Sequence, residues 1–285
     1  MNIISILSNR KSVRKFTDEE VGVDILERII NYGKKSEALF NNISIEFKLI
    51  TDGHSFFKNV RGRAGYFGKV FYAPHYIVAI SQDSDGFLEN MGYRMENLMI
   101  IAHELGLSTC WMELLFNSEK INDILNIDKG YRALVFTPIG YEKKTMIGRL
   151  TKKQEPKKSQ RKELKQIIDF DKWNTHREPR GNLEADFLKI LQHARLAPSW
   201  GNTQPWKFLI DGSKVLLFCQ DDKIRARQRK LNYYKIDCGI IMLYVKLLAA
   251  EFGIKGRWIL DKNKLKVNVY NTPNNYEYIG FFAVF

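Results

Sequence analysis

The chain is similar to itself, and this internal repeat limits its fold more than any other feature of the sequence. Residues 100–111 align with residues 247–258 without a gap, and alanine, glutamate, glycine and tryptophan coincide in the two copies. Residues 131–140 resemble residues 276–285 in the same order along the chain. An accidental similarity of two helices is the alternative, but the shared order favours a true repeat. We therefore expect a fused pseudo-dimer, in which one chain supplies the surface that two identical subunits would share.

Each copy has the apolar pattern of a unit that contains both helices and strands. Leu26, Ile29 and Ile30 recur at helical spacing, and residues 45–49 alternate between apolar and polar side chains as a strand does. Residues 91–105 are apolar on most sides, which is typical of a buried helix. The pattern predicts an α+β fold built from two tandem repeats.

Positive charge gathers between the two repeats. The formal net charge is +13, and ten of the 45 lysines and arginines lie in residues 142–166, a segment with few large apolar side chains. Such a segment is typical of a solvated connector. We expect a first repeat over residues 1–150, a basic linker over 151–170 and a second repeat over 171–285. The charge could also serve nucleic acid, but no known recognition motif accompanies it, so nucleic acid is not an expected partner.

Several classes of protein lack their usual signals in this chain. Three cysteines without C-x-x-C spacing predict neither disulfides nor a zinc site, and they favour a reducing, cytoplasmic environment. We expect no signal peptide, and the apolar stretch 238–250 is too short to span a membrane. The residue four positions after His103 is Leu107, so no zinc-protease motif forms and no metal is expected. Because hydrolase, P-loop and Rossmann motifs are absent as well, a bound cofactor is the expected source of chemistry.

A cluster of hydrogen-bond donors lies near the start of the chain. Arg10, Lys11, Ser12 and Arg14 carry three cationic groups and one hydroxyl within five positions. Forked and charge-assisted donors of this kind are strong partners for a phosphate group. A basic run near a terminus is also a common solvated surface, so the pattern alone leaves both interpretations open.

A rigid polar loop lies in the second repeat, where a helix ends at Pro198 and a strand begins after Pro205. We call residues 197–206 the amide loop because they carry Asn202 and Gln204. Amide side chains both donate and accept, which suits recognition of a heterocycle edge or a sugar-like chain. A plain loop in which these amides cap the backbone is the equally weighted alternative.

Taken together, these segments resemble one family. Residues 10–16 resemble the R-R-S-V-R-x-F opening of the FMN-dependent nitroreductases, and residues 197–206 resemble their A-P-S-x-x-N-x-Q-P-W segment. Residues 106–111 are similar to the family's G-L-G-S-x-W stretch, and residues 138–141 to its I-G-Y-P turn. The resemblance implies a nitroreductase-like fold with central antiparallel sheets flanked by helices, and FMN sites assembled from both halves of a dimer. Here one chain carries both halves, so we expect a monomer.

The resemblance also implies a role for each matched residue. No catalytic side chain is expected, because the flavin carries electrons by a ping-pong mechanism from NADH or NADPH to a nitroaromatic, quinone or similar acceptor. Trp200 would border the substrate pocket or lie on the surface. The FMN-binding residues implied are Arg10, Lys11, Ser12, Arg14 and Arg149 for the phosphate and ribityl chain, Thr109 and Cys110 through their backbone, and Pro198, Ser199, Asn202 and Gln204 from the second repeat.

The second copy of each motif is incomplete. Residues 38–46 lack the prolines of the amide loop, and residues 175–180 lack the serine of the opening motif. The sequence therefore predicts one FMN per chain and a decayed twin site. The alternatives are a flavin-binding or flavin-sensing protein without turnover, and another flavoenzyme of the same fold that performs reductive dehalogenation or flavin fragmentation.

Overall fold

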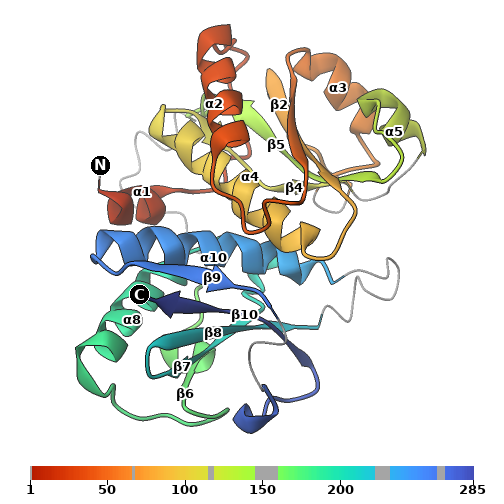
Figure 1. Ribbon diagram of the computed structural model, residues 1–285. Coiled ribbons are helices and arrows are strands. Elements are labelled where there is room, and N and C mark those ends of the chain that lie inside the picture. The colour runs from red at the N-terminus through yellow and green to blue at the C-terminus, as the bar shows by residue number, and fades with distance from the viewer. Residues whose placement is uncertain (1, 66–67, 115–118, 145–159, 222–231, 262–266) are drawn as a thin grey trace. The chain divides into compact units, whose positions relative to one another are not determined.

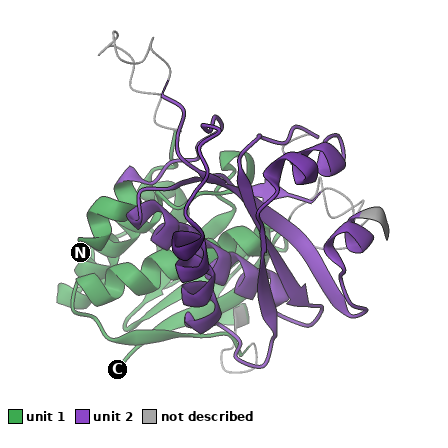
Figure 2. Ribbon diagram, turned by 90° about the horizontal axis from the view of Figure 1, so that it is seen from above, with its two compact units in different colours: residues 1–8, 156–285 green, residues 9–155 purple. Residues whose placement is uncertain are grey.

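The computed structural model describes residues 2–65, 68–114, 119–144, 160–221, 232–261 and 267–285 (Figure 1). The chain divides into two compact units (Figure 2). Unit 2 is Asn9–Glu155, and unit 1 combines Met1–Ser8 with Pro156–Phe285. Helix α1 (Ile3–Asn9) precedes the other elements.

Unit 2 contains one antiparallel sheet. Its strands follow the order β1-β2-β5-β3, and β4 also pairs with β5. The elements are α2 (Val23–Lys35), β1 (Ile45–Ile50), α3 (Gly53–Val60), β2 (His75–Gln82), α4 (Phe87–Glu104), β3 (Ser108–Thr109), β4 (Met112–Glu113), α5 (Glu119–Leu125) and β5 (Tyr131–Gly140).

Helices cover both faces of this sheet. Helices α2 and α4 contact each other, α2 contacts β1, and α4 contacts β2 and β3. The approach of α2 is close, because a Cβ atom at Gly33 would lie 2.8 Å from Leu98 Cδ1 and 2.9 Å from Phe47 Cδ2. On the other face, side chains of α3 and α5 pack with Tyr76 and Phe136 of the central strands. Unit 2 is therefore a three-layer α+β unit.

Unit 1 also contains a five-stranded sheet, as unit 2 does. Its sheet follows the order β6-β7-β8-β10-β9, in which β6 pairs parallel to β7 and the other pairs are antiparallel. Helix α10 contacts α8, β8 and β9. The elements are α7 (Leu164–Ile167), β6 (Ile168–Phe170), α8 (Gly181–Ala194), η1 (Trp200–Asn202), β7 (Trp206–Asp211), β8 (Lys214–Gln220), α10 (Tyr234–Glu251), β9 (Gly256–Ile259), η3 (Val267–Tyr270) and β10 (Tyr276–Val284).

The basic segment between the repeats is partly folded. Residues 164–170, which the sequence analysis places in the linker, form α7 and β6 of unit 1. Ile167, Ile168 and Phe170 are buried, at 1%, 3% and 5% exposure. These apolar side chains follow directly after the lysine-rich stretch and contribute to the core of unit 1. The prediction of a linker rests on the high charge of the segment and does not take them into account. The limits of the first repeat (1–150), the linker (151–170) and the second repeat (171–285) stay predictions of domain organisation.

The predicted repeat is confirmed by the two long helices. Helix α4 and helix α10 have 18 residues each and end in the same motif. In α4, Gly106 adopts a φ of 82° and Leu107 N donates to Ala102 O at 2.9 Å. In α10, Gly253 adopts a φ of 73° and the amide of the next residue donates to Ala249 O at 2.8 Å. The coinciding glycines are therefore required by a left-handed helix end in both copies.

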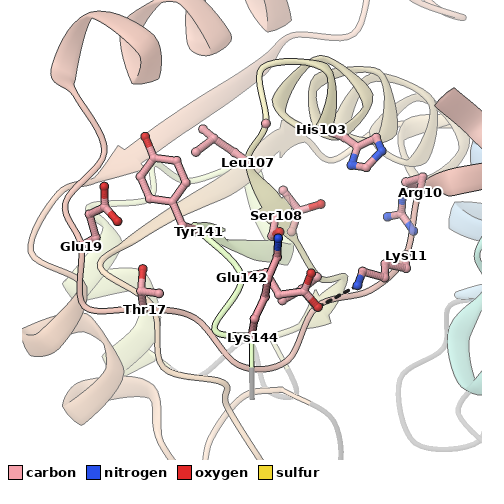
Figure 3. A pocket seen from close by; sticks show the side chains of 13 residues that line it. Arg10, Lys11, Thr17, Glu19, His103, Leu107, Ser108, Tyr141, Glu142 and Lys144 are labelled. Atoms are coloured by element: carbon pink, nitrogen blue, oxygen red, sulfur yellow. Dashed lines mark hydrogen bonds and ion pairs between the residues drawn. The ribbon is translucent and has the colours of Figure 1, made fainter. Parts of the chain in front are cut away.

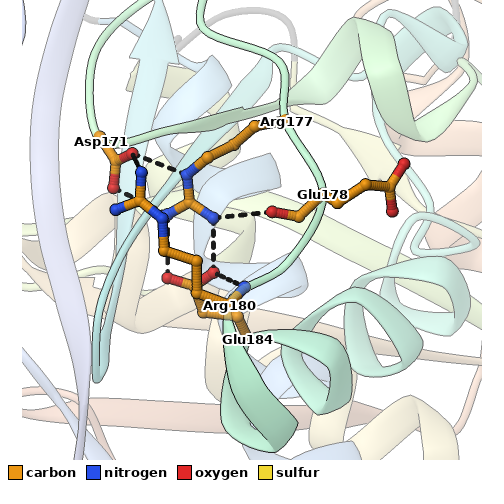
Figure 4. Close-up of polar contacts among 5 residues, drawn as sticks. All are labelled: Asp171, Arg177, Glu178, Arg180 and Glu184. Carbon is orange, nitrogen blue, oxygen red and sulfur yellow. Dashed lines mark hydrogen bonds and ion pairs between the residues drawn. The ribbon is translucent and has the colours of Figure 1, made fainter.

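An arginine network holds the segment before α8 in unit 1 (Figure 4). The Arg177 guanidinium donates to both carboxylate oxygens of Asp171, at 2.7 and 2.8 Å, and to both of Glu184, at 2.7 and 3.0 Å. The same group lies 4.4 Å from the ring centre of Phe170. Glu184 also accepts from Arg180 N at 2.6 Å. These bonds lower the pKa of Asp171 and of Glu184 below the usual carboxyl values.

Replacement of Arg177 by methionine should therefore destabilise unit 1 in a pH-dependent way. At pH 7 we expect a loss of about 3 kcal/mol, because Glu184 would stay buried without its counter-charge. Carboxyl groups whose pKa is lowered in the folded state stabilise it above about pH 4 and lose this effect as the pH falls. Urea unfolding at pH 7 and pH 3 should thus show a difference between variant and wild type that shrinks at the lower pH.

Arg180 provides the control for this experiment. Its side chain is 71% exposed and lies 3.5 Å from Asp171. Arg180→Met should cost less than about 1 kcal/mol, as exposed ion pairs do. A difference for Arg177→Met that stays constant between pH 7 and pH 3 would contradict the assignment to Asp171 and Glu184.

Candidate functional site

The opening motif forms an extended segment that lies between two parts of unit 2. We call Arg10–Thr17 the docked segment. Val13 N donates to Thr109 O at 2.9 Å, and Thr17 N donates to Tyr141 O at 2.9 Å. Ser12 forms a parallel bridge with Thr109. The structure thus brings the predicted residues of the opening motif beside Thr109 and Cys110, from a distant part of the sequence.

Side chains of the docked segment point to different surroundings, as alternate residues of an extended chain do. Lys11, Val13 and Thr17 line a pocket, whereas Ser12 and Arg14 do not. Ser12 forms a side-chain hydrogen bond with the Cys110 thiol, whose pKa is raised by burial. Arg14 is exposed, with its guanidinium 6.0 Å from the ring centre of Phe71. The predicted donor cluster is therefore divided rather than gathered at one point.

Arg10 is committed to a buried ion pair. Its Nε lies 2.9 Å from Glu96 Oε1, and the two side chains are 4% and 0% exposed. Nη2 donates to Glu96 Oε2 at 3.2 Å, and Trp111 Nε1 donates to the same oxygen at 2.5 Å. Glu96 was not identified from the sequence, because nothing in the local pattern of α4 separates it from a surface glutamate. The ion pair therefore holds the Arg10 guanidinium against Glu96 of α4, at the edge of the site.

The pocket on the Lys11 face of the docked segment is polar (Figure 3). Its volume is about 440 Å³. Lys11 Nζ lies 2.7 Å from Glu142 Oε1 across it. The Thr17 hydroxyl is buried without a hydrogen-bond partner among the described residues. The remaining lining residues are Arg10, Val13, Glu19, His103, Gly106, Leu107, Ser108, Thr109, Tyr141 and Lys144.

His103 is the titratable ring in this pocket. Burial lowers the pKa of His103, and the charges of Arg10 and Lys11 lower it further. The imidazole is therefore neutral near pH 7, with one nitrogen that can donate and one that can accept. The sequence around His103 suggests no role for this residue other than that of a metal ligand, which its spacing excludes. Among the described residues, no group of His, Cys, Asp and Glu is arranged to hold a metal ion.

The amide loop lies in unit 1 and has an unusual backbone. Gly201, Asn202 and Gln204 have φ values of 55°, 58° and 48°, in the left-handed region. Ser199 Oγ accepts from Gln204 N at 2.9 Å, and this bond supports the turn. Trp200 N donates to Asp237 Oδ1 at 3.1 Å, which fixes the loop to the first turn of α10. Pro198, Ser199 and Trp200 are half-buried.

The amides of this loop bond to the last residues of the basic segment. Gln204, at 2% exposure, accepts from Lys162 N at 2.8 Å and donates to Gln160 O at 3.3 Å. Asn202 donates to Gln160 O at 2.8 Å and accepts from Arg161 Nη1 at 2.5 Å. Both amides thus bond to the chain itself, as in the alternative interpretation in which they cap the backbone of a plain loop.

The predicted FMN-binding residues are thus distributed over both units. The opening motif, Thr109 and Cys110 belong to unit 2, and the amide loop belongs to unit 1. The assembly of one site from the two sets stays a prediction. Arg149 lies outside the described residues. Within the described part of the chain, no helix is long and apolar enough to cross a membrane.

Comparisons with known proteins bear on the family and the fold. The family model described as "Putative TM nitroreductase" matches residues 2–249. A search of proteins with curated functions finds none that is similar. A crystal structure of a putative nitroreductase from Thermotoga maritima MSB8 is similar over 100% of this chain and 93% of that chain, with 17% identity and a TM-score of 0.57. At that identity the similarity shows a shared fold.

Two further solved structures match about half of the chain. An FMN-dependent nitroreductase from Clostridium difficile R20291 is 24% identical over 50% of this chain and 88% of that chain, with a TM-score of 0.43. A nitroreductase family protein from Clostridium novyi NT is 25% identical over 50% of this chain and 87% of that chain, with a TM-score of 0.43. Because the family model covers most of the sequence, including both motifs, the chain belongs to this nitroreductase family.

Proposed function

We propose that the protein is an FMN-dependent oxidoreductase that takes electrons from NADH or NADPH and passes them to a nitroaromatic, a quinone or a similar small acceptor. The observation that carries the proposal is the docking of Arg10–Thr17 on Thr109, in a chain whose family match includes the opening motif and the amide loop. FMN, when bound, supplies the electron transfer, so no side-chain acid or base is required.

The donor set suits a phosphate at two residues of the docked segment. Ser12 offers a hydroxyl and Arg14 an exposed guanidinium, and neither lies on the pocket face with Lys11. Arg10 would hold the phosphate only after leaving Glu96, which would strand a buried carboxylate. Within the proposal, Ser12 and Arg14 therefore bind FMN, and Arg10 orients the backbone beside them. The backbone of Thr109 and Cys110 forms the floor.

The other half of the proposed site comes from the amide loop. Pro198 and Ser199 are the half-buried residues that would contact the cofactor, and Trp200 would border the space for the acceptor. Because one chain carries both sets of residues, we expect a monomer with a single FMN. The Arg177 guanidinium in unit 1 already donates to the carboxylates of Asp171 and Glu184 and to Glu178 O, so it is not available to a phosphate, and this supports the loss of the twin site.

The absorption spectrum of the purified protein after incubation with FMN and gel filtration tests the proposal. We expect a flavin band with about one FMN per chain. Anaerobic NADH or NADPH should bleach the band, and a nitroaromatic or quinone should restore it. A band that neither donor bleaches would favour a flavin-binding or sensing role, and the absence of any band would overturn the proposal. About two FMN per chain would contradict the decayed twin site.

Arg14→Ala tests the phosphate-binding role of the docked segment. We expect the Kd for FMN to rise at least about tenfold, because a charge-assisted hydrogen bond contributes about 1.5 to 3 kcal/mol and about 1.4 kcal/mol is tenfold. Lys15→Ala is the matched control, since it removes the same charge from the next exposed position and should change the Kd less than about twofold. Equal effects in the two variants, measured by quenching of flavin fluorescence, would contradict a specific role for Arg14.

A further inference from the structure

The end of the basic segment and the amide loop are joined by a dense set of hydrogen bonds within unit 1. We call Gln160–Lys162 the connector end. We propose that Asn202 and Gln204 are positioning residues that anchor the connector end, rather than residues that face the bound flavin. The inference concerns bonds within one unit and does not depend on the proposed flavin chemistry.

Gln204 has no amide hydrogen left for a ligand. Its Nε2 donates to Gln160 O at 3.3 Å and to Asn202 O at 3.1 Å, and its Oε1 accepts from Lys162 N at 2.8 Å. The residue is 2% exposed. A primary amide has two hydrogens to donate, and both are used here. Recognition of a second group by this side chain would require the loss of a bond to the connector end.

Asn202 pairs with the connector end through both atoms of its amide. Nδ2 donates to Gln160 O at 2.8 Å, and Oδ1 accepts from Arg161 Nη1 at 2.5 Å. Arg161 continues the contact, because its Nη2 donates to Leu196 O at 2.8 Å. Two consecutive residues of the connector end are thus bound by one asparagine, one of them through its backbone.

The Arg195 side chain at the helix end and a backbone oxygen of the loop bind Lys162 from two further directions. Lys162 Nζ donates to Gln204 O at 2.9 Å, and Arg195 Nη1 donates to Lys162 O at 3.2 Å. Burial lowers the pKa of Lys162, and the neighbouring charge of Lys207 lowers it further. Every residue from 160 to 162 therefore bonds to the segment 195–204.

The left-handed backbone of the amide loop favours asparagine at position 202 but not glutamine at position 204. A left-handed φ is common for asparagine but costs about 1 to 2 kcal/mol for a residue such as glutamine. Strain of this kind persists where surrounding contacts determine the conformation. Gln204 at a φ of 48° is held by its bonds to the connector end and by Ser199. The bonds that anchor the connector end therefore also hold Gln204 in its left-handed conformation.

Hydrogen exchange of the Lys162 amide tests the anchor, because this N–H donates to Gln204 Oε1. In Gln204→Leu we expect it to exchange about tenfold faster, as loss of one hydrogen bond predicts. Thr203→Val is the matched control: its hydroxyl bonds within the loop, to Trp200 O, so exchange should change less than about twofold. Unchanged exchange in Gln204→Leu would overturn the proposal.

The wild-type protein provides a second measurement that needs no variant. If the Gln204 amide instead faces the flavin, saturating FMN must break its bond to the Lys162 amide and speed exchange there. We expect FMN to leave this exchange unchanged, and faster exchange would overturn the anchor. If the protein binds no FMN, the proposed function fails while the comparison of Gln204→Leu with Thr203→Val still decides the anchor.

Discussion

The buried ion pair between Arg10 and Glu96 determines the geometry of the site in unit 2. Two charges that are 4% and 0% exposed cannot be separated without leaving one of them unpaired in the interior. The pair therefore fixes the start of the docked segment to α4, and the bond from Trp111 holds the carboxylate in place. From that point the segment runs along Thr109, which bridges to Ser12 and accepts from Val13 N at 2.9 Å.

Because of the Arg10–Glu96 ion pair, the basic residues of the opening motif do not form one cluster. A run of basic residues suggests a single phosphate-binding cluster, but in the structure each of the three side chains contacts a different group. Arg10 holds the segment to α4, Lys11 pairs with Glu142 across a polar pocket, and Arg14 lies exposed near Phe71. The same holds for the amide loop, whose Asn202 and Gln204 are used by the chain itself. Polar residues of a motif can thus be bound by other parts of the same chain.

Local patterns were sufficient to predict the repeat and its elements, because helix ends, strand alternation and buried helices depend on nearby residues. The coinciding glycines 106 and 253 are an example, since both end a helix in the left-handed conformation. The partners of Arg10 and Gln204 could not be predicted in this way. Glu96 lies 86 positions from Arg10, and Lys162 lies 42 positions from Gln204, so tertiary folding alone selects them.

An arginine–carboxylate pair attaches the segment in both units, but the contribution of apolar burial differs. In unit 2, the V and F of the opening motif are core residues, because Val13 and Phe16 are both 5% exposed. Burial of such side chains contributes about 1.5 to 3 kcal/mol each, so the polar residues between them need not hold the segment. In unit 1, residues 175–180 lack apolar residues, and Arg177 holds the segment through two carboxylates. An arginine used for attachment, as Arg10 and Arg177 are, is not available to an anion, whereas Arg14 is exposed beside Phe71.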